Sequence, residues 1–193
     1  MMQSPSARLV AAFALCAAVG LSGCAEKTRY GDARGVETVT NQFGSTDLQM
    51  IAESMTRSML NTPVVAGGNL PIMTVQEVKN KTSEYIDTRA ITDSIRVELQ
   101  KSGRVRFAVD AAAMEQQIEE LKRQQSDYYD VNKSAEIGKM VGAAFRLDGN
   151  ITSIVKEAKG VKDVYYKFNL QLWNVQNGLL EWTDEKEIRK TTS

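Results

Sequence analysis

The segment Val164–Trp173 constrains the fold more than any other stretch, because apolar and polar residues alternate along it. This period of two is the pattern of a β-strand that buries one face and leaves the other toward solvent. Asn177-Gly178 follows and predicts a hairpin turn into a further strand over Leu179–Ile188. A strand over Phe145–Lys156 precedes it, with a turn near Gly160. The last third of the chain therefore predicts three antiparallel strands, whose apolar face the rest of the chain has to cover.

The preceding region alternates between strand-like and helix-like patterns. Apolar stretches at Leu70–Val78 and Arg104–Val109 predict two more strands. Apolar residues at spacings of three and four predict four helices, two of them capped by Asp87 and Asp110. These helices cover 46–60, 88–102, 111–125 and a segment from Asn132 or Ser134 to 144, the last with Ile137, Met140, Val141 and Ala144 packed inward. Together the elements predict an α/β or α+β fold, a mixed, largely antiparallel sheet of about five strands packed against about four helices.

The N-terminus carries the pattern of a bacterial lipoprotein signal peptide. Arg8 provides a positive start, Leu9–Val19 is an apolar run too short to span a bilayer, and Leu21-Ser22-Gly23-Cys24 has the form of a lipobox. We expect residues 1–23 to be the signal peptide, cleavage to fall between Gly23 and Cys24, and Cys24 to carry the lipid. An ordinary cleaved signal peptide, or an N-terminal helix that happens to contain a cysteine, is the alternative.

A lipid on Cys24 would decide the compartment of everything that follows. Each buried methylene of an acyl chain such as palmitate contributes about 0.8 kcal/mol, so two or three chains hold a protein on a membrane. Ala25 stands where an aspartate would resemble an inner-membrane retention signal, so we expect the outer membrane, with the protein facing the periplasm. The polar residues 24–45 predict a flexible tether, and residues 46–193 predict a single globular domain that is a monomer.

Composition excludes several classes of function. Lys+Arg and Asp+Glu number 24 each, so no net charge favours nucleic acid. The chain has no histidine, the commonest general base and transition-metal ligand. Cys16 lies in the signal peptide and Cys24 is used by the lipid, so no thiol remains. We therefore expect no catalytic residue, no metal and no cofactor, and interpret the chain as a binding or adaptor protein rather than an enzyme.

Three aromatic residues are the candidates for partner binding. Tyr128 and Tyr129 stand side by side in a polar loop, where an amphipathic ring provides contact area at a low entropy cost. Alternatively, one of the two tyrosines closes over the core. Trp173 lies on the polar face of its strand and could act as a platform for a sugar ring, whereas Trp182 is expected in the core.

Several motifs together resemble the LpoB-type penicillin-binding protein activators, outer-membrane lipoproteins of Gram-negative envelopes. Besides the lipobox, the resemblance covers the folded part from about Thr46 to Glu187. The residues that carry it are Leu21-Ser22-Gly23-Cys24, Glu84-Tyr85-Ile86-Asp87-Thr88 with Ile91, Ile95 and Leu99, Ser102-Gly103-Arg104-Val105-Arg106-Phe107, Gly142-Ala143-Ala144-Phe145-Arg146-Leu147-Asp148-Gly149, Leu170-Gln171-Leu172-Trp173, Asn177-Gly178 and Glu181-Trp182.

The resemblance implies a protein that catalyses nothing itself but docks on a class A penicillin-binding protein, a bifunctional peptidoglycan synthase. It would activate the synthase allosterically, by binding the active arrangement more tightly than the resting one. The chain departs from the family in its tether, which is short and has no proline between Cys24 and Thr62, whereas well-known members have a long proline-rich one. Two alternatives remain: an envelope assembly component related to the curli-secretion lipoproteins, and a peptidoglycan-binding module that uses Trp173 and the tyrosines.

Overall fold

The computed structural model describes residues 28–192. The chain divides into two compact units, Met1–Gly35 and Val36–Ser193. Gly23 and Cys24, with the rest of the expected signal peptide, lie outside the described residues. Residues 28–35 contain a turn in which the Gly35 N–H donates to the carbonyl oxygen of Asp32 at 3.1 Å.

The helices of the second unit begin where local chemistry places them. The side chains of Asp87 and Asp110 accept from the N–H groups of Ala90 and Ala113, both at 3.0 Å, and so cap two helices as predicted. In chain order the elements are α2 (Ser45–Leu60), α3 (Pro63–Ala66), β1 (Ile72–Val75), β2 (Lys79–Lys81), α4 (Thr88–Lys101), β3 (Arg106–Phe107), α5 (Ala111–Gln124), the short 3-10 helix η1 (Val131–Lys133), β4 (Phe145–Ala158), β5 (Val161–Asn174) and β6 (Leu180–Thr192).

The strands form one mixed sheet in the order β3-β1-β4-β5-β6, and β2 also pairs with β4. β4, β5 and β6 are antiparallel neighbours, whereas β1 and β2 run parallel to β4, and β3 runs parallel to β1. β1 pairs with the start of β4 and β2 with its middle, so two successive short strands share one edge of a long one. The predicted mixed sheet is confirmed. No sequence pattern predicts β2, because its three residues are all exposed and polar.

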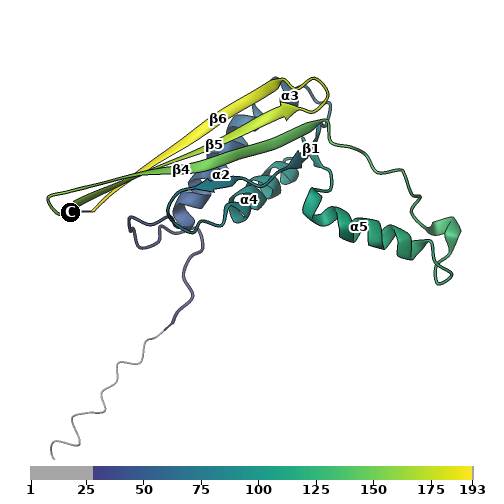
Figure 1. Ribbon diagram of the computed structural model, residues 1–193, viewed down its shortest axis with the longest axis horizontal. Coiled ribbons are helices and arrows are strands. Elements are labelled where there is room, and N and C mark those ends of the chain that lie inside the picture. Colours follow the sequence, from purple (N-terminus) through teal and green to yellow (C-terminus); the bar gives the residue numbers. More distant parts are fainter. Residues whose placement is uncertain (1–27, 193) are drawn as a thin grey trace, which may run out of the picture. The chain divides into compact units, whose positions relative to one another are not determined.

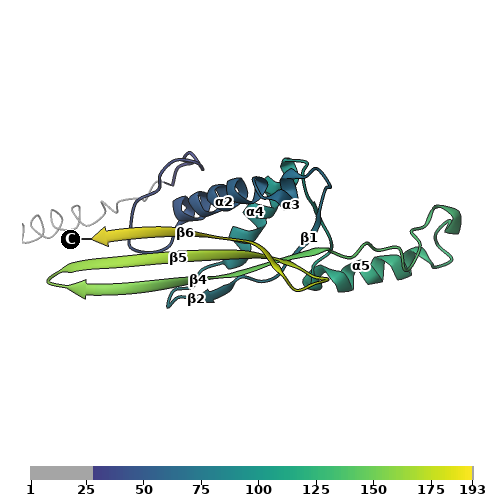
Figure 2. The ribbon, with the colours of Figure 1, turned by 90° about the horizontal axis from the view of Figure 1, so that it is seen from above.

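Helices α2 and α4 pack against each other and against one face of the sheet (Figure 1). Figure 2 looks onto the opposite face, where no helix of residues 36–192 lies over β4 and β5. Side chains at alternate positions of these strands meet the apolar stripes of the helices in one core. Burying a side chain of this kind contributes about 1.5–3 kcal/mol. The fully buried members include Ile51, Met55, Met59, Ile91, Leu99, Leu147, Ile151, Tyr166, Phe168, Leu170 and Leu172.

The helix predicted from Asn132 or Ser134 to residue 144 is wrong. Residues 134–144 form turns and irregular backbone, and Gly138 has a φ of 82°, which interrupts any right-handed helix. The side chains expected inside are exposed: Ile137 by 66%, Met140 by 48% and Val141 by 66%, with Ala144 also exposed. Helix α3 was not predicted; it begins at Pro63, with the Thr62 side chain accepting from the Val65 N–H.

The hairpin between β5 and β6 lies where Asn177-Gly178 predicts it, but its loop is longer than a two-residue turn. Asn174 N–H donates to the carbonyl oxygen of Leu179 at 2.9 Å, so four residues separate the paired ends. Gly178 supplies the positive φ, 73°, that this loop requires. A register shift between Leu172 and Trp173 accompanies the loop.

Candidate partner-binding surfaces

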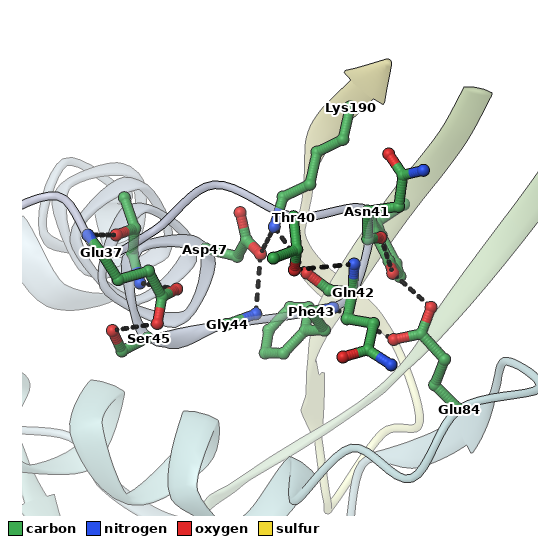
Figure 3. Close-up of polar contacts among 12 residues, drawn as sticks. Glu37, Thr40, Asn41, Gln42, Phe43, Gly44, Ser45, Asp47, Glu84 and Lys190 are labelled. Atoms are coloured by element: carbon green, nitrogen blue, oxygen red, sulfur yellow. Dashed lines mark hydrogen bonds and ion pairs between the residues drawn. The ribbon is translucent and has the colours of Figure 1, made fainter. Parts of the chain in front are cut away.

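Residues 37–43 lie along the domain and are held there by polar contacts; we call them the N-terminal strap (Figure 3). The hydroxyl of Tyr166 donates to the carbonyl oxygen of Asn41 at 2.8 Å and contacts Glu84 Oε1 at 2.5 Å. Glu84 Oε2 accepts from the Phe43 N–H at 3.0 Å. The Phe43 ring meets the Tyr166 ring edge-on, with centroids 5.8 Å apart. Burial, followed by the hydrogen bond to Glu84, raises the pKa of Tyr166, so its hydroxyl remains a donor.

A second set of contacts joins the strap to the first turn of α2 and to the end of β6. The Lys190 ammonium forms an ion pair with the Asp47 carboxylate and donates to the carbonyl oxygen of Gln42 at 2.7 Å. Asp47 is only 2% exposed and also accepts from the Gly44 N–H at 2.8 Å. Because the buried carboxylate has both a hydrogen-bond donor and a counter-charge, the cost of removing it from water is offset.

Glu37 begins the strap and contacts the N-terminus of α2. Its Oε1 accepts from the Thr46 N–H at 3.1 Å and its Oε2 from the Ser45 hydroxyl at 2.9 Å. The backbone hydrogen bond from Thr46, followed by the bond from Ser45, lowers the pKa of Glu37. The positive end of the α2 dipole favours a carboxylate at this position. The strap falls within residues 24–45, where the sequence predicts a tether, and its lack of periodicity gave no signal of these contacts.

Tyr128 and Tyr129 lie in the turn that follows α5. Tyr128 is 94% exposed and Tyr129 is 43% exposed, so neither closes over the core. The chain folds back on the end of α5 just beyond them, where the Gln125 side chain donates to the carbonyl oxygen of Ala135 at 2.8 Å. We call α5 and residues 125–144 the arm. Its exposed apolar side chains are Ile118, Tyr128, Tyr129, Ile137, Met140 and Val141.

Trp173 lies apart from the tyrosines, near the end of β5 and on the face opposite the core. It is half-buried, whereas its neighbour Leu172 is fully buried against the helices. Its indole N–H donates to Asp148 Oδ1 at 3.1 Å, and Asp148 Oδ2 pairs with the Arg146 guanidinium at 3.2 Å. The indole borders an open pocket of about 570 Å³. Neither Tyr128 nor Tyr129 lines the pocket. The other lining residues are Thr74, Gln76, Ala143, Arg146, Asn174, Val175 and Gly178.

A second hollow, of about 480 Å³, lies beside β1, α4 and the start of α5. Arg96 dominates it and is paired with Asp93 at 3.1 Å and with Asp110 at 3.3 Å. The same guanidinium lies 5.9 Å from the centroid of the Phe107 ring. The Arg96 guanidinium is thus paired with carboxylates of the fold itself. Among residues 28–192, no group of three His, Cys, Asp or Glu side chains could hold a metal ion, and no helix is both long and apolar enough to cross a membrane.

Among solved structures, the chain is similar to the LpoB C-terminal domain from Salmonella enterica, with 19% identity and a TM-score of 0.46 over 74% of this chain and 98% of that one. The corresponding domain from Escherichia coli gives 20% identity and a TM-score of 0.45 over the same shares, 74% and 98%. The PelC dodecamer from Paraburkholderia phytofirmans gives 15% identity and a TM-score of 0.37, over 67% of this chain and 78% of that one. No curated protein matches the chain.

The family assignment rests on a match to the family described as "Peptidoglycan-synthase activator LpoB", which covers residues 47–188. This range begins in the first turn of α2, ends within β6 and contains the whole sheet up to that point. It thus includes the core and both candidate surfaces, the arm and the Trp173 pocket. The chain belongs to the LpoB family of peptidoglycan-synthase activators.

Proposed function

We propose that the protein is a lipid-anchored regulator of the outer membrane that faces the periplasm, binds a class A penicillin-binding protein and activates it allosterically. The family match over residues 47–188 carries this proposal. The lipobox Leu21-Ser22-Gly23-Cys24 supports the anchor, with cleavage after Gly23 and the lipid on Cys24. A regulator of this kind needs only a surface that fits one state of the synthase better than another.

The arm is the surface that we propose for the synthase. Its exposed tyrosine and aliphatic side chains are close in sequence and lie on a segment with few contacts to the sheet. Clustered apolar side chains on a surface are typical of protein-binding sites, and tyrosine is enriched among residues that dominate binding energy. Tyr128, which is 94% exposed, is the residue most available to enter a pocket on the partner.

We propose that the freely moving tether is confined to residues 24–36. The strap contacts of Glu37, Asn41 and Phe43 support this limit, because they fix the chain from residue 37 onward. Fully extended, a chain from Cys24 to Val36 reaches about 40 Å. The synthase would therefore have to present its docking surface close to the membrane in which this protein is anchored.

The test is a polymerisation assay with lipid II, the full-length protein in detergent and the class A synthase of the same organism. We expect the protein to raise the rate of glycan polymerisation. The double variant Tyr128→Ala/Ile137→Ala should lose about tenfold in affinity for the synthase, since two exposed anchor side chains are removed. Gln116→Ala, at an exposed polar position on α5 in the same arm, is the control and should activate normally.

Two results would contradict the proposal at different levels. An unchanged polymerisation rate together with no detectable complex would reject synthase activation. Normal activation by the Tyr128→Ala/Ile137→Ala variant would keep the function but move the docking surface away from the arm.

A further inference from the structure

The face of the sheet opposite α2 and α4, which we call the open face, ends in a row of side chains contributed by three strands. Thr74 of β1 pairs with Arg146 of β4, and Arg146 pairs with Trp173 of β5. Because residues in register share a face of a sheet, these three side chains stand side by side. The pocket of about 570 Å³ opens beside this row, a volume within the usual range for small-ligand sites.

The indole of Trp173 is held in one orientation before any ligand arrives. Its N–H is engaged by Asp148, and the same carboxylate is fixed by Arg146. With its polar edge satisfied, the indole offers its apolar ring to the pocket. The Nε atom of Arg146 is buried and has no hydrogen-bond partner among the described residues. After a small side-chain shift, its N–H could donate to a ligand oxygen.

The charge and chemistry of the lining select the ligand. Arg146 is the only charged residue that lines the pocket in the described part of the chain, and Asp148 neutralises it. The other lining groups are hydroxyl and amide side chains, such as Thr74 and Gln76, and the apolar side chains of Ala143 and Val175. An aromatic ring next to neutral polar groups suits a sugar, whose ring has an apolar C–H face and a rim of hydroxyls. Apolar groups next to an amide also fit the methyl and amide of an acetamido substituent.

Figure 2 shows the strand β5 running from its end near the pocket along the open face. Most side chains of β5 on this face are polar. Counting alternate positions of β5 from Trp173 to Tyr165 gives a path of about 26 Å. Charges along it are balanced in number, since Lys167 pairs with Glu185 at 2.5 Å, and Arg189 and Glu187 of β6 lie opposite Tyr165 and Lys167 on the same face. Such a path suits an extended neutral polymer better than a charged peptide. Within this path, the half-buried positions of β5 on the open face are Tyr165, Lys167, Asn169, Gln171 and Trp173.

We infer that the Trp173 pocket binds an N-acetylated amino sugar within a glycan strand of peptidoglycan, and that the open face accepts the neighbouring sugars. The choice of peptidoglycan among glycans rests on the family to which the chain belongs. The binding does not depend on a synthase. It would keep the protein on the glycan while the arm remains available to the synthase.

The experiment uses the full-length protein in detergent and two neutral probes, the tetramer of N-acetylglucosamine and the tetramer of glucose, measured by titration calorimetry. We expect saturable binding of the N-acetylglucosamine tetramer, and binding of the glucose tetramer about tenfold weaker. Trp173→Ala should weaken the N-acetylglucosamine complex about tenfold, and Trp173→Phe about threefold, because the phenyl ring retains the stacking surface. Gln76→Ala, at an exposed position that does not affect the core, should weaken it about threefold.

Tyr128→Ala removes an exposed aromatic ring from another surface and is the control, which should bind the tetramer as the wild type does. Co-sedimentation with purified sacculi in the absence of synthase should follow the same order of variants. No binding of the tetramer at millimolar concentration, or equal binding by folded Trp173→Ala protein, would overturn the inference. If Trp173→Ala weakens only the synthase complex, the pocket is part of the protein interface instead. Failure of synthase activation with intact tetramer binding would reject the proposed function alone.

Discussion

Single side chains in the strap join parts of the chain that are far apart in the sequence. Lys190 contacts Asp47, 143 positions earlier, and Tyr166 contacts Asn41, 125 positions earlier. Glu84 stands between them in sequence and receives hydrogen bonds from both the strap and the core. Contacts of such long range add stability only after most of the chain has folded, because the entropy of closing the loop is lost first.

Lys190→Met tests the buried ion pair. The substitution leaves the Asp47 carboxylate buried without its counter-charge, and we expect a loss of about 3 kcal/mol in the free energy of unfolding. Denaturation by urea measures this. Lys162→Met, at an exposed position of β5, should change stability by less than about 0.5 kcal/mol. If Asp47→Asn in the Lys190→Met background restores no stability, the explanation by an uncompensated charge is incorrect.

Glu37→Gln tests the strap through pH. The pKa of Glu37 is lowered from its ordinary value of 4.5, first by the backbone hydrogen bond from Thr46. A lowered pKa contributes stability that is complete above the pKa of the unfolded chain and is lost as pH falls through the pKa of the folded one. The wild type should therefore melt at a higher temperature than Glu37→Gln at pH 7, and the two melting curves should converge below pH 4.5. A difference that persists unchanged at pH 3 would contradict this assignment.

At the scale of elements, the pairing of β4 with β5 is the long central ladder of the sheet. It runs without interruption from Phe145↔Asn174 to Ala158↔Val161. β5 owes its strict alternation of buried and half-buried residues to its central place, with β4 and β6 on either side and the helices on one face. The arm is the opposite case. α5 has a capped start and an amphipathic sequence but contacts the sheet little. Its apolar face is therefore only partly covered: Leu121 is buried, whereas Ile118 remains exposed.

Gly149→Ala tests the close approach of β4 to β5. A Cβ at this position would lie 2.1 Å from the backbone oxygen of Asn169, which cannot move without breaking the ladder. We expect a loss of about 3 kcal/mol, through displacement of the strands, measured by thermal and urea unfolding. Gly142→Ala, which meets nothing within 4 Å and lies in the irregular part of the arm, is the control and should leave stability unchanged. Equal stability of the two variants would show that the strands can separate at Gly149 at little cost.

At the scale of the molecule, anchoring and folding belong to separate parts of the chain. The core lies entirely within residues 36–193, whereas the proposed lipid site is at Cys24. The strap marks where the folded unit begins, so its contacts determine how much chain remains as a tether. Reach toward a partner and stability of the strap are thereby linked, because releasing residues 37–43 would lengthen the tether.

Cys24→Ala tests this separation. The substitution removes the only proposed point of lipid attachment and leaves the core untouched, so the variant should unfold at the same temperature as the wild type. Fractionation of cells should recover it from the soluble periplasmic fraction, whereas the wild type remains with the outer membrane. Attachment of the variant to the membrane at the wild-type level would contradict lipidation at this cysteine.

Local sequence determined those features that depend on neighbouring residues. The alternation in Val164–Trp173 established the central strand and its buried face, and Asp87 and Asp110 established two helix starts, because period and capping act over a few positions. The motifs also identified the family, which the match over residues 47–188 confirmed. The sequence singled out Tyr128, Tyr129 and Trp173 as candidates for partner binding, but it left open whether one of the tyrosines closes over the core, and it did not predict the residues that surround them.

Tertiary structure decided the rest, since it depends on residues that the sequence places far apart. Ile137, Met140 and Val141 have helical spacing, but the positive φ of Gly138 interrupts any helix there. No other part of the described residues covers these side chains. β2 exists only because β4 offers it an edge. The strap is held by Glu84 and Lys190, and the Trp173 indole by Asp148, through contacts that no local period reveals. Periodicity specifies which face of an element is buried, whereas the partner of each side chain is specified only when the elements pack.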